Sequence, residues 1–165
     1  MDTRHARLIS AMTEYDRGDA ARIQHLIKVH SFAATIAQLE NVDREALFIL
    51  ETAAILHDIG IHVCESKYGD CSGKHQEQEG PAEARKLLAA VGGYTPEQTE
   101  RVCFLIAHHH TYRNVEGIDW QILLEADFLV NAFEEGVSES GIRTFESKVF
   151  KTATGRRLLE TMFGI

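Results

Sequence analysis

The chain has 165 residues, with 44% hydrophobic and 25% charged side chains and only 2 prolines. This composition is typical of one compact globular domain and excludes disordered and repetitive proteins. The formal net charge of −8 argues against binding to bulk nucleic acid or to an anionic membrane, because both need clustered lysine and arginine. No stretch approaches the roughly 18 consecutive apolar residues that span a bilayer.

The cysteines and the N-terminus indicate the compartment. Cys64, Cys71 and Cys103 form an odd set without a CxxC spacing, which is typical of reduced thiols. No apolar signal segment follows Met1, so we expect a cytoplasmic protein.

Hydrophobic residues recur at helical spacing nearly throughout, and we expect an all-α protein with a single domain over residues 1–165. Taken in chain order, the predicted helices cover about 3–16, 19–40, 43–60, 80–92, 95–109, 120–133, 139–150 and 156–163. The second of these is apolar on almost every side and is expected to be central. Residues 61–80 carry no predicted helix, and residues 68–74, which are polar and include glycines, are expected to form a loop.

Several residues mark where these helices begin and end. Asp19, Asp43 and Thr95 are good N-caps. Gly60 is a typical C-terminal stop, and Pro81 suits the first position of a helix. The apolar C-terminal segment, 158–165, is expected to cover the core, although contact with another subunit stays open.

Two acidic motifs lie in apolar surroundings. Asp127 follows Ile122–Ala126 and is flanked along the helix by leucine and valine. An ionised carboxylate there is costly unless it is paired or bound to a cation. His57 and Asp58 sit at a predicted helix end, where neighbouring side chains point about 100° apart and can hold a metal from two directions.

Histidines are the most unusual feature, with 9 in the chain and three of them consecutive. His109 falls on the apolar stripe of its helix and is expected to face the core, with His110 just beyond it. On the central helix the periodicity does not choose between His25 and His30. Imidazoles and carboxylates without thiolates predict a site for Fe, Mn, Zn or Mg rather than a structural zinc site.

In this order, the motifs resemble the HD-domain superfamily of metal-dependent phosphohydrolases. Gln24–Val29 is similar to its first histidine motif, Ala54–Gly60 to the His-Asp motif, and Glu125–Asp127 to the last aspartate motif. The resemblance spans about residues 19–135. It implies a helical bundle of about seven to nine helices.

The resemblance also implies the ligands. His25, His57, Asp58 and Asp127 would hold one divalent metal ion. A second ion would use His109, His110 and a histidine near the start of the next helix, where this chain has Glu79. The number of ions, one or two, stays open.

The implied reaction is hydrolysis of a small phosphate ester, such as a nucleotide, by metal-activated water. Asp58 would be shared between the ions, and His109 or His62 would protonate the leaving group. Many relatives carry a lysine after the Ile-Gly pair, where this chain has Ile61. We expect His62, Lys67 or Lys74 to contact the substrate phosphate instead.

Two other functions stay open at this stage. A di-iron oxygenase of the HD type would use similar ligands, and a non-catalytic module would bind a nucleotide without turning it over. We expect no nucleic-acid and no membrane partner, and either a monomer or a homo-oligomer.

Overall fold

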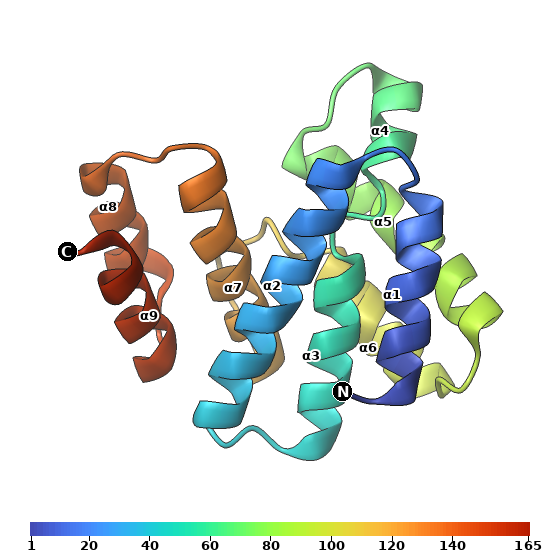
Figure 1. The fold of residues 1–165 in the computed structure, drawn as a ribbon, viewed down its shortest axis with the longest axis horizontal. Coiled ribbons are helices and arrows are strands. Elements are labelled where there is room, and N and C mark those ends of the chain that lie inside the picture. Colours follow the sequence, from blue (N-terminus) through green and yellow to red (C-terminus); the bar gives the residue numbers. More distant parts are fainter.

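The computed structural model describes residues 1–165, and the chain folds into nine helices without strands (Figure 1). The predicted all-α bundle is therefore confirmed. The helices are α1 (Thr3–Tyr15), α2 (Ala20–Leu39), α3 (Arg44–Leu56), α4 (Ile61–Tyr68), α5 (Gly73–Val91), α6 (Pro96–Ile106), α7 (Ile118–Glu134), α8 (Glu139–Val149) and α9 (Ala153–Phe163).

The predicted N-caps are confirmed. The Asp19 side chain accepts a hydrogen bond from the Arg22 amide at 3.0 Å. Asp43 accepts from two amides of the first turn of α3. Thr95 and Gln98 form a capping box at the start of α6. These side chains satisfy amides that have no partner inside the helix, so the caps fix where each helix begins.

Helix α2 lies at the centre of the bundle, as predicted, between α7 on one side and α3 on the other (Figure 1). Its apolar residues Leu26, Val29, Ala33 and Ile36 are fully buried. Helix α6 packs against α3 and α5, and α1 packs against α3 and α5. Polar residues of α2 that face this interior need partners in it.

The His-Asp motif lies in a turn rather than at the end of a longer helix. Helix α3 ends at Leu56, and residues 57–60 form the turn into α4. Gly60 was expected to stop the helix, but it is the N-cap of α4 and has a right-handed φ of −79°. Glycine is needed there for space: a Cβ on Gly60 would lie 2.7 Å from the Gly80 nitrogen of α5.

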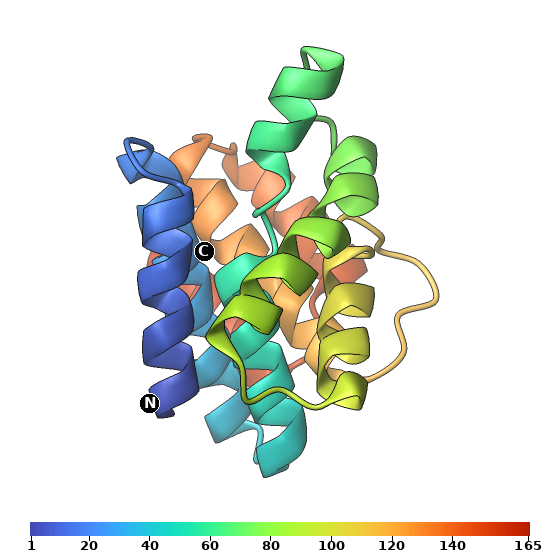
Figure 2. The ribbon, with the colours of Figure 1, turned by 90° about the vertical axis from the view of Figure 1, so that its right-hand side faces the viewer.

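Most of residues 61–80 is helical, contrary to the sequence analysis, and the predicted loop is shorter, over residues 69–72. Residues 61–68 form α4, whose buried Ile61 and Cys64 are one helical turn apart. Helix α4 packs on α5 and projects beyond the other helices (Figure 2). Helix α5 begins at Gly73, capped by Ser72, so Pro81 lies inside the helix rather than at its first position. The earlier start changes which residues of α5 face the interior.

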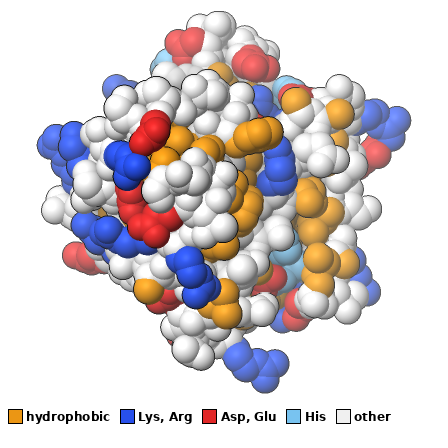
Figure 3. All heavy atoms as spheres, turned by 60° about the vertical axis from the view of Figure 1, so that its left-hand side comes forward, with side chains coloured by type: hydrophobic (Ala, Val, Ile, Leu, Met, Phe, Trp, Pro, Cys, Tyr) orange, Lys and Arg blue, Asp and Glu red, His pale blue; other side chains and the backbone are white.

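The C-terminal helices close the bundle at α7. Leu159 of α9 is fully buried, while Met162 stays 41% exposed. The buried Glu125 of α7 accepts hydrogen bonds from the Lys151 and Thr152 amides and holds the start of α9. The outer face of this region carries strips of hydrophobic side chains broken by charged ones (Figure 3). The C-terminal segment thus covers the core, as expected.

One segment is apolar enough to cross a membrane by length and composition alone. It covers Arg44–Tyr68, and 78% of its apolar stretch is buried inside the protein. The turn between α3 and α4 interrupts it. Its apolar character follows from its place in the core.

Candidate metal centre

Four side chains from three parts of the chain converge at the end of α3. His25 comes from α2, His57 and Asp58 from the turn after α3, and Asp127 from α7. The Nε2 atoms of His25 and His57 lie 3.2 Å apart. Asp127 Oδ1 lies 3.3 Å from His25 Nε2 and 3.4 Å from His57 Nε2, and Asp58 Oδ2 lies 3.6 Å from His25 Nε2. Ligands about 2.0–2.2 Å from one ion have such separations, so this donor set fits a divalent metal.

Asp58 also faces a second group of donors. Its Oδ1 lies 3.3 Å from His109 Nε2. Asp58, His109 and His110 offer ligand atoms within 4.8 Å of one another. The two oxygens of Asp58 therefore divide between two histidine groups, His25 on one side and His109 on the other.

Local helix chemistry explains how two of these imidazoles are oriented. His57 Nδ1 donates to the Ala54 carbonyl at 2.9 Å, and His109 Nδ1 donates to the Ile106 carbonyl at 2.7 Å. Both carbonyls belong to the last turn of a helix, where carbonyl groups lack a partner in the helix. Each bond places the proton on Nδ1 and leaves the Nε2 lone pair facing the cluster.

Outer partners hold the remaining ligands. His25 Nδ1 bonds to Glu134 Oε2 at 2.8 Å, and Glu134 also pairs with Lys28. Asn131 donates to Asp127 Oδ1 at 2.9 Å. A carboxylate behind a ligating histidine fixes its ring and raises its basicity. The sequence analysis did not identify Glu134, although its position one helical turn beyond Asn131 and two beyond Asp127 places all three on one face.

The two buried carboxylates of the cluster favour the binding of positive charge. Burial would raise the pKa of Asp58 and Asp127, but the surrounding imidazoles lower both well below the usual range. Burial would lower the pKa of His25, but its hydrogen bond with Asp127 and the charge of Asp58 raise it to about 9. Without a metal the two carboxylates therefore hold protons on the histidines, and a divalent ion would replace those protons.

A cavity of about 280 Å³ opens onto the cluster. Its polar lining includes Arg22, His25, Asp58, His110 and Glu134. Arg22 Nη1 lies 3.5 Å from Asp58 Oδ2. A larger cavity of about 650 Å³ is lined by residues of α8 and by Tyr112 and Arg113, and it contains no residue of the cluster.

Glu79 does not join the cluster, contrary to the sequence prediction. Its carboxylate accepts hydrogen bonds from Lys67 at 2.9 Å and from Tyr68 at 2.5 Å. The residue of α5 that reaches the histidines is Gln76, whose Oε1 lies 3.0 Å from His110 Nε2 and 3.3 Å from His109 Nε2. Because α5 begins at Gly73, Gln76 and Gly80 share its buried face and Glu79 turns toward α4.

None of the three residues expected to bind substrate lines the cavity. Lys67 is paired with Glu79, Lys74 is exposed, and His62 lies 3.3 Å from the buried Asp16. Arg22 is the cation that reaches the cavity. It precedes His25 by three residues on α2, and this spacing on one helical face was a signal available in the sequence.

Two further histidines lie elsewhere. His108 donates through Nδ1 to the Phe104 carbonyl and stacks on the Phe104 ring, so it is not part of the cluster. His30 contacts Glu51 of α3 rather than the cavity. Between His25 and His30 on α2, the tertiary structure thus brings His25 to Asp58.

The family model described as HD domain matches residues 22–143. No curated protein matches the chain. Among solved structures, the chain is similar to a predicted HD superfamily hydrolase from an uncultured Thermotogales bacterium. The two share 26% sequence identity and a TM-score of 0.64, over 95% of this chain and 83% of the other.

Proposed function

Because this chain belongs to the HD domain family, as its motifs predicted, we propose that it is a metal-dependent hydrolase of small phosphate esters. The observation that carries the proposal is the division of Asp58 between the His25 and His109 groups, at the base of an open cavity. The description of the similar solved structure as a predicted hydrolase supports the reaction class. Nucleotides are the first substrates to test, since a cavity of about 280 Å³ suits a small ligand.

His25, His57, Asp58 and Asp127 would hold the principal metal ion. A divalent ion there would polarise a phosphoryl oxygen and lower the pKa of a coordinated water. The second donor group has one charged ligand, Asp58, which it shares with the first group. Where a charged ligand was expected, it has the neutral Gln76. We therefore propose one tightly bound ion per chain and a second that binds more weakly.

Gln76 nevertheless presents an oxygen to that second group. Its Nε2 donates to the Cys71 carbonyl at 2.8 Å, which turns Oε1 toward His109 and His110. Amide oxygens suit hard ions such as Mg²⁺ and Mn²⁺ better than soft ones. Titrating the metal-free protein with each divalent ion would identify the preferred metal.

The chain's own residues would bind and orient the substrate. The Arg22 guanidinium lines the cavity beside Asp58 and presents several donors to phosphate oxygens. Asn131 and Glu134 hold Asp127 and His25 in place. His110 also lines the cavity, whereas His109 is fully buried. Burial lowers the pKa of His110 to about 4, so its neutral ring is suited to hold a metal rather than to donate a proton.

The test measures phosphate release from nucleoside mono-, di- and triphosphates and from p-nitrophenyl phosphate, with Mg²⁺, Mn²⁺, Fe²⁺ or Zn²⁺ added singly. We expect Asp58→Asn to lower kcat/KM at least about 1,000-fold, because it removes the ligand common to both groups. Arg22→Ala should raise KM by about 10- to 100-fold, as expected for losing charged hydrogen bonds to phosphate. Arg113→Ala, at the other cavity, is the matched control and should change neither.

Three outcomes would contradict the proposal. Full activity of Asp58→Asn would remove the metal centre from the reaction. Oxygen consumption with Fe²⁺ and no phosphate release would favour the oxygenase. Tight nucleotide binding without turnover under every metal would favour the binding module.

A further inference from the structure

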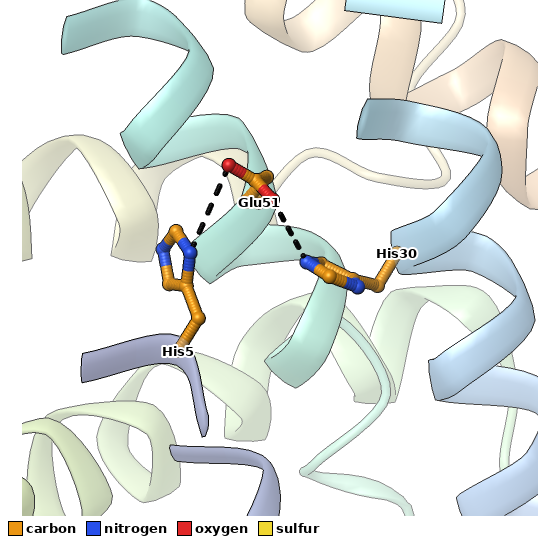
Figure 4. Close-up of side chains that lie close together, drawn as sticks. All are labelled: His5, His30 and Glu51. Carbon is orange, nitrogen blue, oxygen red and sulfur yellow. Dashed lines mark hydrogen bonds and ion pairs between the residues drawn. The ribbon is translucent and has the colours of Figure 1, made fainter. Parts of the chain in front are cut away.

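A separate group of ligand atoms lies between α1, α2 and α3. It lies outside the metal centre described above, here called the HD centre, which consists of His25, His57, Asp58, Asp127, His109 and His110. The separate group consists of His5, His30 and Glu51, whose ligand atoms lie within 4.8 Å of one another (Figure 4). Both imidazoles point at the Glu51 carboxylate from opposite sides (Figure 4). His30 follows His25 by five residues on α2, about 140° around the helix, and therefore faces away from the HD centre.

The His5 ring has a lone pair that no donor satisfies. His5 Nε2 lies 3.2 Å from the Phe48 carbonyl and 3.0 Å from Thr52 Oγ1. The Thr52 hydroxyl itself donates to the Phe48 carbonyl, so both neighbours accept and Nε2 carries the proton. Burial lowers the pKa of His5, which keeps the ring neutral.

The ring nitrogen of His5 that carries no proton is therefore Nδ1. His5 is fully buried, and its Nδ1 has no hydrogen-bond partner. It faces Glu51 Oε2 at 3.7 Å, so two groups with lone pairs face each other. A buried polar atom without a partner is costly, and a metal ion held by both groups would satisfy both lone pairs.

On the other side of the carboxylate, His30 contacts the second Glu51 oxygen. His30 Nε2 lies 3.1 Å from Glu51 Oε1. Burial would raise the pKa of Glu51, but the hydrogen bond with His30 lowers it, so the carboxylate is ionised. The group thus offers two imidazole nitrogens and one anionic oxygen, with side-chain exposures of 0%, 8% and 15% for His5, His30 and Glu51.

We propose that His5, His30 and Glu51 bind a divalent transition-metal ion, Zn²⁺ in the first instance, that joins α1 to α2 and α3. Two histidines and a glutamate are a common zinc ligand set, with solvent in the fourth position. Ligands about 2.0–2.2 Å from a tetrahedral ion lie about 3.4 Å apart. His5 lies 3.7 Å from one Glu51 oxygen and His30 lies 3.1 Å from the other. Since all three ligand atoms lie within 4.8 Å of one another, no pair has to approach by more than about 1.4 Å to reach this tetrahedral spacing.

The orientation of His5 also matches that of ligands in the HD centre. There, His57 and His109 each donate one ring nitrogen to a backbone carbonyl and direct the other into the cluster. In His5 the roles of the two nitrogens are exchanged: Nε2 donates to the Phe48 carbonyl and Nδ1 faces Glu51. A route for the ion exists, because Glu51 lines two surface cavities of about 360 and 390 Å³, one beside His5 and one beside His30.

The test uses the full chain, stripped of metal, in a background in which Asp58→Asn and Asp127→Asn disable the HD centre. Zn²⁺ alone is titrated, and bound metal is counted by elemental analysis after equilibrium dialysis. We expect this background to bind one equivalent. Adding His30→Gln or Glu51→Gln should weaken that binding at least about 100-fold, since each removes one of three protein ligands.

Controls separate this site from the HD centre and from misfolding. Both variants keep roughly the size and polarity of the side chain that they replace, so thermal melting should show folded proteins. His108→Gln changes a histidine outside both centres and should bind zinc as the background does. If the background variant does not fold, the measurement becomes the difference of one equivalent between the unmodified chain and Glu51→Gln.

Zinc binding that survives both His30→Gln and Glu51→Gln would overturn the proposal. So would a folded background that binds no zinc, in which case the three residues form only a buried ion pair. Neither result depends on hydrolysis, so the proposed function stands or falls separately. His30→Gln in the otherwise unmodified chain should keep full phosphatase activity.

Discussion

At the scale of single residues, the HD centre depends on side chains that bind no substrate and no metal. Imidazole rings rotate freely unless their second nitrogen is held. Backbone carbonyls hold His57 and His109, whereas His25, in the middle of α2, has no free carbonyl nearby and uses Glu134 instead. Glu134 therefore positions His25 through a charge that Lys28 partly balances.

Replacing Glu134 tests this role. We expect Glu134→Ala to lower the affinity for the principal metal ion by about 10- to 100-fold, the usual effect of losing such a partner. Glu134→Gln should recover part of the loss, because an amide oxygen still accepts from Nδ1 but carries no charge. Titration of the metal-free protein with Mn²⁺ or Zn²⁺ measures both, and Glu135→Ala serves as the neighbouring control. Equal affinities for all variants would show that His25 needs no partner.

At the scale of elements, the turn from α3 to α4 owes its position to a close crossing with α5. A Cβ on Gly60 would lie 2.7 Å from the nitrogen and 2.8 Å from the Cα of Gly80. These atoms belong to a helix backbone and cannot rotate away. The same turn carries His57 and Asp58, so this contact sets both the packing of α5 and the place of two ligands.

A single methyl group at this crossing should be costly. We expect Gly60→Ala to lower the free energy of unfolding by about 1–3 kcal/mol, the range for overpacking. Gly141→Ala in α8 is the matched control, since its Cβ would meet side-chain atoms of Val137 and Ser138 rather than backbone, and alanine favours helix by up to about 1 kcal/mol. Urea denaturation compares the two. Similar stability of both variants would refute the role of the crossing.

At the scale of the whole molecule, the charge of the centre couples folding to pH and to metal. The pKa of His25 in the metal-free protein is raised from 6.5 to about 9. A group with a raised pKa contributes stability fully below its unfolded value and loses that contribution as the pH rises through its folded value. The low pKa values of Asp58 and Asp127 act only in strong acid, outside this window.

The metal-free protein should therefore lose up to about 3 kcal/mol of stability between pH 6.5 and pH 9. With metal bound, His25 carries no proton on the nitrogen that faces the centre, so that loss disappears. The rise in Tm on adding metal should be larger at pH 8.5 than at pH 6.5. Calorimetry with and without Mn²⁺ at the two pH values measures it, and a rise that shrinks with pH would contradict the assignment.

The sequence by itself determined the parts of the molecule that depend on local chemistry. Helical periodicity and the caps Asp19, Asp43 and Thr95 predicted most helices within a few residues, since these signals act within one turn. The order of the His, His-Asp and Asp motifs predicted the family. Both follow from spacing along the chain, which a reader of the sequence can measure directly.

Only the tertiary structure decided which side chains meet. Helix α5 extends back to Gly73, and its packing directs Gln76 toward the histidines and Glu79 toward Lys67. Because α2 packs between α7 and α3, His25 lies in the HD centre and His30 contacts Glu51. Arg22, which the sequence analysis did not single out, lines the cavity, whereas Lys67 and Lys74 do not. Contacts between elements depend on rotations of whole helices, and a shift of one residue turns a side chain by about 100°.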